Sequence, residues 1–157
     1  MKIIYRTSDH TTVSPPENEQ VNPVLLRCLQ HRNASKTSDW RNPIDLLLAP
    51  QTLKHVDAFC VLFEKLLQSD AHIVVVGDYD CDAATATAVA VKALRMLGYQ
   101  RVDFVIPDRF TFGYGLSPQL VEHIHTSLPS TQALLTVDNG VASVDGVAKA
   151  KSFGWKV

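Results

Sequence analysis

Apolar and polar positions follow two different patterns along the chain, and the change comes near residue 71. Before it, apolar residues recur at helical spacing in residues 24–29 and again in residues 53–67, which predicts two amphipathic helices. Asn22 and Pro23 offer the first helix an N-cap and a first-turn proline. We therefore expect an irregular polar arm (1–21), a helical segment (22–70) and an α/β domain (71–157).

From residue 72 onward, short aliphatic runs alternate with helical stretches. Strands are predicted at residues 73–76, 102–106 and 133–137, each followed by a helix. Residues 155–157 resemble the first residues of a fourth strand. This order is typical of the α/β class, with a parallel, doubly wound sheet whose crossover helices pack on its faces.

Aspartates follow the predicted strands. Asp78, Asp108 and Asp138 each come within two residues of the end of an aliphatic run. The carboxyl ends of parallel strands meet at one edge of a sheet, where ligands usually bind. Asp78, Asp80 and Asp82 alternate in "GDYDCD", so an extended backbone would send all three to the same side. Carboxylates this crowded require a cation, and oxygen ligands favour Mg²⁺ or Mn²⁺. Asp138 is placed to bridge two ions.

Each aspartate also has a purely structural interpretation. Asp82 is well placed to cap the helix predicted to begin two residues later, and for this residue capping and metal binding stay equally open. Asp78 and Asp80 are not needed as caps, so we interpret them as metal ligands. Asp138 precedes Asn-Gly, a pair that forms turns readily, and Asp108 is also consistent with a turn.

Other aspartate-rich motifs fit less well. An EF-hand loop beginning at Asp78 would need Gly and Glu where the chain has Ala83 and Val89. A haloacid-dehalogenase-type phosphatase usually has Thr or Val at the position of Asp82, so it stays a weak rival. The sequence contains neither GxGxxG nor GxxxxGK[ST], so no motif points to a dinucleotide or to a P-loop nucleotide.

Composition narrows the function classes only a little. The 157 residues carry 15 basic and 16 acidic side chains, so no overall positive field indicates a nucleic-acid partner. Neither a secretory leader nor a membrane span is recognisable, and we expect a cytoplasmic protein without a membrane partner. The three cysteines form no CxxC pair, which argues against a zinc knuckle or a disulfide framework.

Three sequence blocks together resemble a known family. "VVVGDYDCDAATATA", "PDRFTFGYGLSPQLVE" and "LLTVDNGVASVDGVAKAKSFG", in this order and spacing, are similar to the N-terminal part of the RecJ exonucleases, a branch of the DHH phosphoesterase family. These enzymes hydrolyse single-stranded DNA from 5′ to 3′ in recombination and repair. The resemblance covers about residues 22–157.

The resemblance implies a two-metal phosphodiesterase, with two Mn²⁺ ions favoured over Mg²⁺. Asp78 and Asp80 match the first metal motif of the family, and Asp138 matches the aspartate of its second motif. The substrate, single-stranded DNA, would contact residues on neighbouring loops. The candidates for that contact are Arg109, Tyr114 and Asn139.

Two departures from the family pattern affect what we expect. Ala83 stands where the family has glycine, and a methyl group would distort the loop if that position needs a positive φ. The Asp-His-His motif, a further aspartate and a second domain of the family are not found in residues 71–157. We therefore expect a partial DHH-type domain that is inactive by itself, with a truncated sheet whose uncovered edge favours self-association.

Two alternative functions remain open at this point. One is a non-catalytic RecJ-like remnant or binding module, which Ala83 favours and the intact Asp78, Asp80 and Asp138 oppose. The other is a DHH-type phosphodiesterase or phosphatase that acts on small nucleotides. The block around Arg109 and the helical segment at 22–70 favour the exonuclease over this second alternative.

Overall fold

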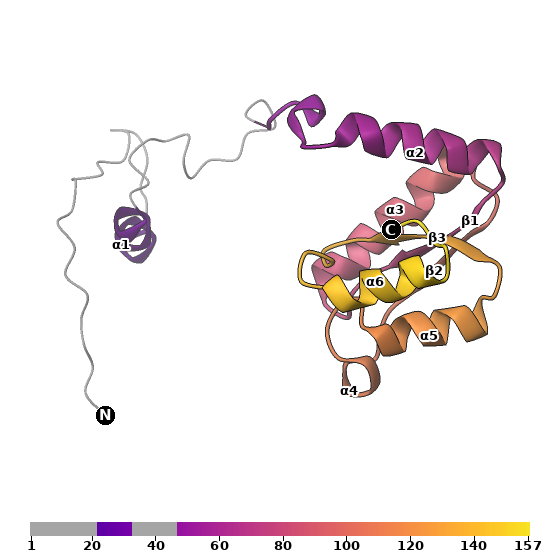
Figure 1. Cartoon of the computed structure of the whole chain (residues 1–157). Helices are drawn as coiled ribbons and strands as arrows, with labels where there is room; N and C mark the ends of the chain where they lie inside the picture. Colours follow the sequence, from indigo (N-terminus) through magenta and orange to yellow (C-terminus); the bar gives the residue numbers. More distant parts are fainter. Residues whose placement is uncertain (1–21, 33–46) are drawn as a thin grey trace. The chain divides into compact units, whose positions relative to one another are not determined.

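The computed structural model describes residues 22–32 and 47–157. The chain divides into two compact units between Val56 and Asp57, and each unit is described by itself (Figure 1). The arm expected at residues 1–21 lies outside the described residues.

Within its described residues, 22–32 and 47–56, the first unit contains one α-helix and one short 3-10 helix. Helix α1 spans Pro23–His31, and η3 spans Pro50–Thr52. Asn22 caps α1 as predicted, because its side-chain Oδ1 accepts a hydrogen bond of 2.9 Å from the backbone N–H of Val24.

The second unit is built on a three-stranded parallel sheet of order β2-β1-β3. The strands are β1 (His72–Val76), β2 (Val102–Val105) and β3 (Thr131–Thr136). The first strand in the sequence therefore lies at the centre, and its two neighbours both come from later in the chain. Such parallel neighbours need long crossover connections, which here contain helices.

Helices cover both faces of this sheet. In Figure 1, α2 and α3 lie on one side of the strands, and α5 and α6 lie on the other. Among the helices of the described residues, none is long and apolar enough to cross a membrane. The helices of this unit are α2 (Val56–Gln68), α3 (Cys81–Met96), α4 (Arg109–Phe112), α5 (Pro118–Ser127) and α6 (Val144–Ser152).

The central strand contributes to two separate hydrophobic cores. Ile73 and Val75 pack in the core that α2 and α3 cover, and Val74 and Val76 pack in the core that α5 and α6 cover. All four side chains are fully buried, and each contributes roughly 1.5–3 kcal/mol by leaving water. The predicted doubly wound α/β architecture is confirmed.

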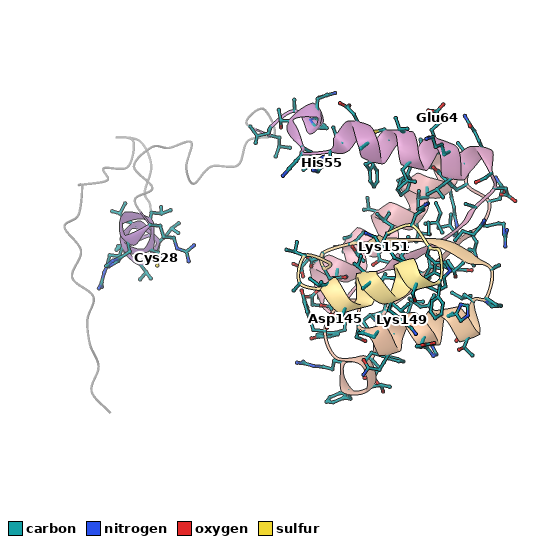
Figure 2. All side chains as sticks on the ribbon, in the orientation of Figure 1. Cys28, His55, Glu64, Asp145, Lys149 and Lys151 are labelled. Carbon is teal, nitrogen blue, oxygen red and sulfur yellow. The ribbon has the colours of Figure 1, made fainter. Side chains whose placement is uncertain are left out.

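Lys149 of α6 joins that helix to α5. Its ammonium group forms an ion pair with Glu122 of α5 and lies 4.8 Å from the ring centroid of Phe153. Figure 2 shows the Lys149 side chain together with its neighbours on α6. The Phe153 ring in turn stacks on His125 of α5, with 4.0 Å between the centroids. These contacts hold together the two helices on this face of the sheet.

The helix boundaries agree with the sequence analysis only in part, and α2 begins at Val56, three residues later than expected. Ser117 caps α5 by accepting a hydrogen bond from the backbone N–H of Leu120. Asp108, which the sequence analysis found consistent with a turn, instead caps the short helix α4 through the backbone N–H of Phe110. Helix α3 begins three residues earlier than expected, at Cys81.

The residues expected to begin a fourth strand pair with β3. Lys156 forms a parallel bridge with Ala133, and its carbonyl oxygen accepts a hydrogen bond of 2.8 Å from the backbone N–H of Leu134. Strand pairing therefore continues beyond β3, on the side away from β1.

Candidate metal centre

Three carboxylates meet at the carboxyl edge of the sheet. The strands β1 and β3 are parallel neighbours, so the segments that follow them lie side by side. One carboxylate oxygen each from Asp80, Asp82 and Asp138 lies within 4.8 Å of the other two. Within the described part of the chain, this is the one group of three or more His, Cys, Asp or Glu side chains arranged to hold a metal ion.

The chemistry of this group fits a hard divalent cation. All three ligand atoms are carboxylate oxygens on exposed side chains, and neither a thiolate nor an imidazole belongs to the group. Oxygen ligands suit Mg²⁺, Ca²⁺ and Mn²⁺ rather than softer ions. The exposure of the side chains lets an ion reach them from solvent.

The crowding of the carboxylates changes the pKa of Asp138. The negative charge of Asp82 raises this pKa most, followed by desolvation and by the charges of Asp80 and Asp78. Desolvation is the main reason why the pKa of the Tyr114 phenol is also raised, and the charges of nearby aspartates add to it. The local field is therefore negative, which is the field that a divalent cation would neutralise.

Asp78 takes a different place from the one that strict alternation predicts. Its side chain is only 1% exposed, and its Oδ1 accepts a hydrogen bond of 2.8 Å from the backbone N–H of Tyr79. The expectation that Asp78, Asp80 and Asp82 point to the same side is wrong, because the backbone does not stay extended through residue 82. Asp78 nevertheless lies near enough to raise the pKa of Asp138.

Asp80, and not Asp82, is the N-cap of α3. Asp80 has extended backbone dihedrals, and its Oδ1 accepts a hydrogen bond of 3.1 Å from the backbone N–H of Ala83. The prediction that Asp80 is not needed as a cap is wrong, and of the two interpretations left open for Asp82 the structure shows no capping. Asp80 combines the two roles that we had treated as alternatives, because it caps the helix and also belongs to the carboxylate group.

The alanine at the usual glycine position fits the backbone without strain. Ala83 is fully buried in the first turn of α3, and it is not among the residues with a positive φ. Its carbonyl oxygen accepts a hydrogen bond of 2.8 Å from the Thr87 hydroxyl. The expected distortion of the loop by the Ala83 methyl group is therefore not found.

Asn139 fixes the position of the loop that carries Asp138. Its side-chain Nδ2 donates hydrogen bonds to the carbonyl oxygens of Val76, Gly77 and Val137, at 3.2, 3.3 and 2.9 Å. Its Oδ1 is buried and has no partner among the described residues. Asp138 itself has a φ of 58°, which is uncommon for a residue other than glycine. The Asn139 amide thus links the end of β1 to the end of β3.

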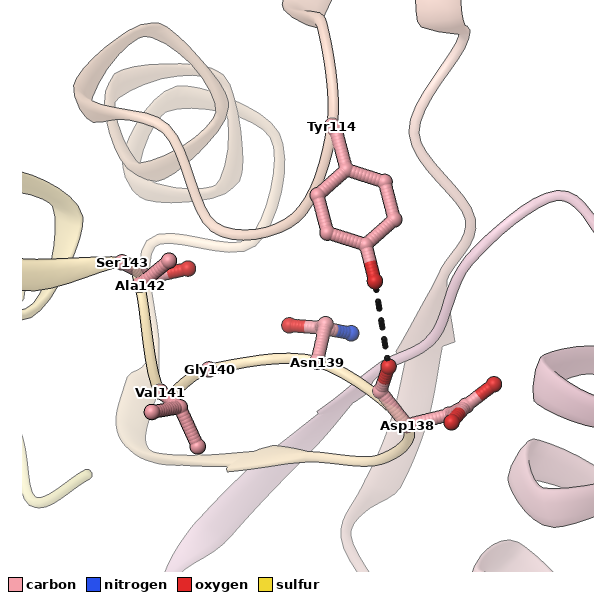
Figure 3. Close-up of a pocket in the computed structure, with 7 residues that line it drawn as sticks. All are labelled: Tyr114, Asp138, Asn139, Gly140, Val141, Ala142 and Ser143. Atoms are coloured by element: carbon pink, nitrogen blue, oxygen red, sulfur yellow. Dashed lines mark hydrogen bonds between the residues drawn. The ribbon is translucent and has the colours of Figure 1, made fainter. Parts of the chain in front are cut away.

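A cavity of about 430 Å³ lies beside Asp138. In Figure 3 the Tyr114 ring stands over the loop that carries Asp138, and its hydroxyl donates a hydrogen bond of 3.4 Å to the Asp138 carbonyl oxygen. The guanidinium carbon of Arg109 lies 4.8 Å from the ring centroid of Tyr79. The cavity is lined by Tyr114, Asp138, Asn139, Gly140, Val141, Ala142 and Ser143.

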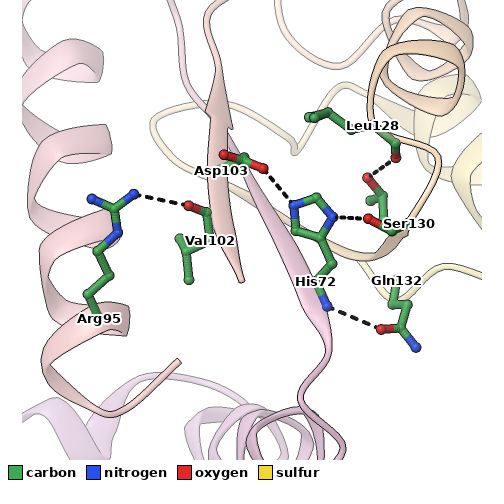
Figure 4. Close-up of polar contacts among 8 residues, drawn as sticks. His72, Arg95, Val102, Asp103, Leu128, Ser130 and Gln132 are labelled. Atoms are coloured by element: carbon green, nitrogen blue, oxygen red, sulfur yellow. Dashed lines mark hydrogen bonds and ion pairs between the residues drawn. The ribbon is translucent and has the colours of Figure 1, made fainter. Parts of the chain in front are cut away.

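A polar cluster that the sequence analysis missed lies at the opposite edge of the sheet (Figure 4). His72 is buried, and its Nε2 lies 2.8 Å from Oδ2 of Asp103, while its Nδ1 lies 2.8 Å from Oγ of Ser130. These residues connect the amino-terminal ends of all three strands. The sequence signal was a histidine directly before an aliphatic run, but its partners are distant in sequence, so periodicity alone does not reveal them.

Comparison with family models gives one match. Residues 72–157 match the DHH family, N-terminal domain. The matched segment begins with β1 and includes every residue of the carboxylate group.

Curated relatives with similar sequences are single-stranded-DNA-specific exonucleases named RecJ. The chain is 36% identical over 149 residues to the protein of Escherichia coli (strain K12), covering 95% of this chain and 25% of that protein. It is 40% identical over 135 residues to the protein of Haemophilus influenzae, covering 86% and 23%. The chain thus spans about a quarter of the length of these relatives.

Two solved structures resemble the fold. A crystal structure of exonuclease RecJ bound to manganese matches with a TM-score of 0.57 and 34% identity, covering 68% of this chain and 26% of that one. The crystal structure of RecJ in complex with Mn²⁺ from Thermus thermophilus matches with a TM-score of 0.56 and 27% identity, covering 86% and 18%.

Proposed function

The chain belongs to the DHH family, and on this premise we propose that it carries the N-terminal DHH domain of a RecJ-like, metal-dependent exonuclease. The proposed reaction is 5′-to-3′ hydrolysis of phosphodiester bonds in single-stranded DNA, in recombination and repair. The observation that carries the proposal is the convergence of Asp80, Asp82 and Asp138 from two neighbouring strand ends. Relatives named for this activity support it.

We propose that Asp80, Asp82 and Asp138 hold Mn²⁺, or Mg²⁺ in its place. The solved relatives bound to manganese support this choice, as does the all-carboxylate ligand set. Asp78 is buried outside this group, and we propose that it supports the site through its nearby negative charge. When bound, such ions supply a hydroxide near neutral pH and stabilise negative charge on the phosphate.

The surrounding side chains position this site and give it contacts for substrate. Asn139 holds the two strand ends together, so its role in the proposal is to position Asp138. Arg109 supplies a cation next to Tyr79 and is the candidate for contact with a phosphate group. The Tyr114 phenol borders the cavity, and its hydroxyl donates a hydrogen bond to the Asp138 carbonyl oxygen.

A second candidate function is hydrolysis of small nucleotides. The cavity of about 430 Å³ beside Asp138 has the size of pockets that take small ligands. The relatives named as exonucleases favour the polymer substrate. A comparison of the two substrate classes on one enzyme preparation distinguishes these functions.

The first experiment measures Mn²⁺ binding to the chain by titration calorimetry. We expect saturable binding that Asp80→Asn and Asp138→Asn weaken by about tenfold or more. Asparagine at position 80 keeps a capping oxygen, so this variant removes the charge without removing the helix cap. Asp145→Asn, an exposed aspartate on α6, is the matched control. Equal affinity in all four proteins would contradict the proposed ligand set.

The second experiment tests hydrolysis in a chimera. This chain replaces the matching region of the Escherichia coli relative, and nucleotide release is measured from single-stranded DNA and from a dinucleotide. Mn²⁺-dependent release from DNA that is lost in Asp138→Asn and kept in Asp145→Asn supports the exonuclease. Release from the dinucleotide alone supports the second candidate. A folded, Mn²⁺-binding chimera that releases nothing from either substrate overturns both.

A further inference from the structure

We propose that Tyr79, Phe110 and Tyr114 form, together with Arg109, a stacking surface for the unpaired bases of single-stranded nucleic acid. The inference rests on the proposed function and deepens it. In this proposal the rings select single-stranded nucleic acid, whereas the carboxylates bind the metal ion.

The segment that carries these side chains contacts both acidic strand ends. Arg109, the first residue of α4, lies over the ring of Tyr79, which stands between Asp78 and Asp80. Tyr114, just beyond α4, donates its hydrogen bond to the carbonyl oxygen of Asp138. Phe110 lies between these two contact points in the sequence. Tyr79 and Tyr114 therefore border the carboxylate group, and Phe110 is the residue next to Arg109 in α4.

Two of the three rings are largely exposed, and the third is partly exposed. Phe110 is 93% exposed, Tyr114 is 63% exposed and Tyr79 is 41% exposed. None of them pairs with another aromatic ring of the described residues, whereas Phe59 and Phe63 stack together and Phe63 also contacts Tyr99. Packing does not explain rings that stay in water, and exposed apolar surface of this kind marks binding sites.

The charges around the rings favour nucleic acid as the occupant. The carboxylates repel phosphates until a cation neutralises them, but the face of a base is uncharged and stacks on an aromatic ring without that penalty. The Arg109 guanidinium adds a positive charge beside the rings, and arginine stacks on bases as well as contacting phosphates. An acidic protein surface, the alternative occupant, would be attracted by Arg109 but repelled by the carboxylates.

Stacking of this kind selects single strands over duplexes. In a duplex, each base is already paired and stacked on its neighbours, so its faces are closed to a protein ring. In a single strand, the faces are open, and each base–ring stack contributes to affinity independently of sequence. The rings would therefore favour unpaired nucleotides directly beside the carboxylates.

The test compares two ligands that differ only in their bases. Affinity for a 3′-labelled single-stranded oligonucleotide and for a base-free sugar-phosphate chain of equal length is measured by fluorescence anisotropy, with Mn²⁺ present. We expect the complete chain to bind the oligonucleotide at least about fivefold more tightly. Phe110→Ala and Tyr79→Ala should each bring this ratio toward one, and Phe110 is too exposed for its loss to unfold the protein.

Phe104→Ala is the matched control, because Phe104 is also an exposed phenylalanine, at 57%, but lies on β2 in a groove lined by α3. We expect its ratio to equal that of the wild type. A wild-type ratio near one, no measurable binding of either ligand, or a ratio that the Phe110 and Tyr79 variants leave unchanged would overturn the inference. The same holds if the rings bind an acidic peptide more tightly than the oligonucleotide. Base-dependent binding without hydrolysis in the chimera would overturn the proposed activity alone.

Discussion

The negative charge of Asp82 is the largest cause of the raised pKa of Asp138. The two residues come from different segments, one in the first turn of α3 and one after β3. Their repulsion is removed when a cation binds between them, so the same pair opposes folding without metal and favours metal binding.

This relationship predicts opposite effects of one substitution on stability and on metal binding. Asp82→Asn removes the repulsion, so we expect a higher melting temperature than wild type in the presence of a chelator. In saturating Mn²⁺ the order should reverse, because the wild type gains more from the ion. Thermal unfolding with and without Mn²⁺ measures both effects. A variant that is less stable than wild type under both conditions would show that repulsion is not the dominant interaction.

Gly77 leaves room for a close contact between the end of β1 and α3. A Cβ atom at this position would overlap Oγ1 of Thr87 and lie 2.7 Å from Cδ1 of Ile106. We expect Gly77→Ala to lower the free energy of unfolding by about 1–3 kcal/mol. Urea denaturation measures this loss. Combining it with Thr87→Ala should recover part of the loss, and strictly additive effects would argue against the overlap with Thr87.

At position 139, we expect substitution by aspartate to destabilise the protein more than substitution by alanine. Its Nδ2 donates to three backbone carbonyl oxygens, and Asn139→Ala leaves them without this donor at a cost of about 1–3 kcal/mol. Asn139→Asp has nearly the same shape but points a carboxylate at the same carbonyl oxygens. We therefore expect the aspartate variant to be the less stable in urea denaturation at neutral pH. The reverse order would contradict the assigned amide orientation.

Replacing Ala83 by the glycine usual in the family should improve neither stability nor Mn²⁺ affinity. Ala83 lies in the first turn of α3 without a positive φ, so Ala83→Gly is expected to lower the free energy of unfolding by about 0.5–1 kcal/mol. Mn²⁺ affinity, measured in the same titration as for the aspartate variants, should stay unchanged. A clear gain in affinity would mean that the Ala83 methyl group restricts the metal centre after all.

The Asp108 carboxylate at the start of α4 should make the stability of the protein depend on pH. Hydrogen bonds from the Phe110 backbone N–H and from the Thr111 hydroxyl lower the pKa of Asp108 below its ordinary value. Because the pKa is lowered in the folded state, the ionised carboxylate stabilises the fold at pH values above its ordinary pKa. This stabilisation disappears as the pH falls through the lowered pKa. The wild type should therefore lose stability relative to Asp108→Asn on acidification. A difference that does not change with pH would contradict the assignment.

The sheet could be predicted from sequence because its signals are local. The aliphatic run at residues 73–76 is buried on both faces and forms a continuous apolar stretch in the sequence. Ser117 followed by Pro118 is a local start signal, and the helix begins where this signal places it. Such signals depend on neighbouring residues alone, so tertiary contacts did not change the result.

The details of the metal centre could not be predicted in the same way. Alternation assumes an extended backbone, but α3 begins directly after Asp80, so Asp78 turns inward while Asp82 joins Asp80 and Asp138. The carboxylate group depends on where a helix starts relative to a strand end, which is a tertiary property. The predicted parallel topology placed Asp138 near the residues that follow β1. The structure confirms that the ends of β1 and β3 lie side by side.

The position of β1 at the centre of the sheet has a consequence for synthesis on the ribosome. β1 emerges before both of its partners, because β2 and β3 follow it in the chain. Its run of four buried aliphatic residues therefore has no partner strand until β2 is translated, and one of its edges stays open until β3 follows. Exposed β-prone segments of this kind associate with one another. We therefore expect β1 to be open to such association between its own appearance and that of β3.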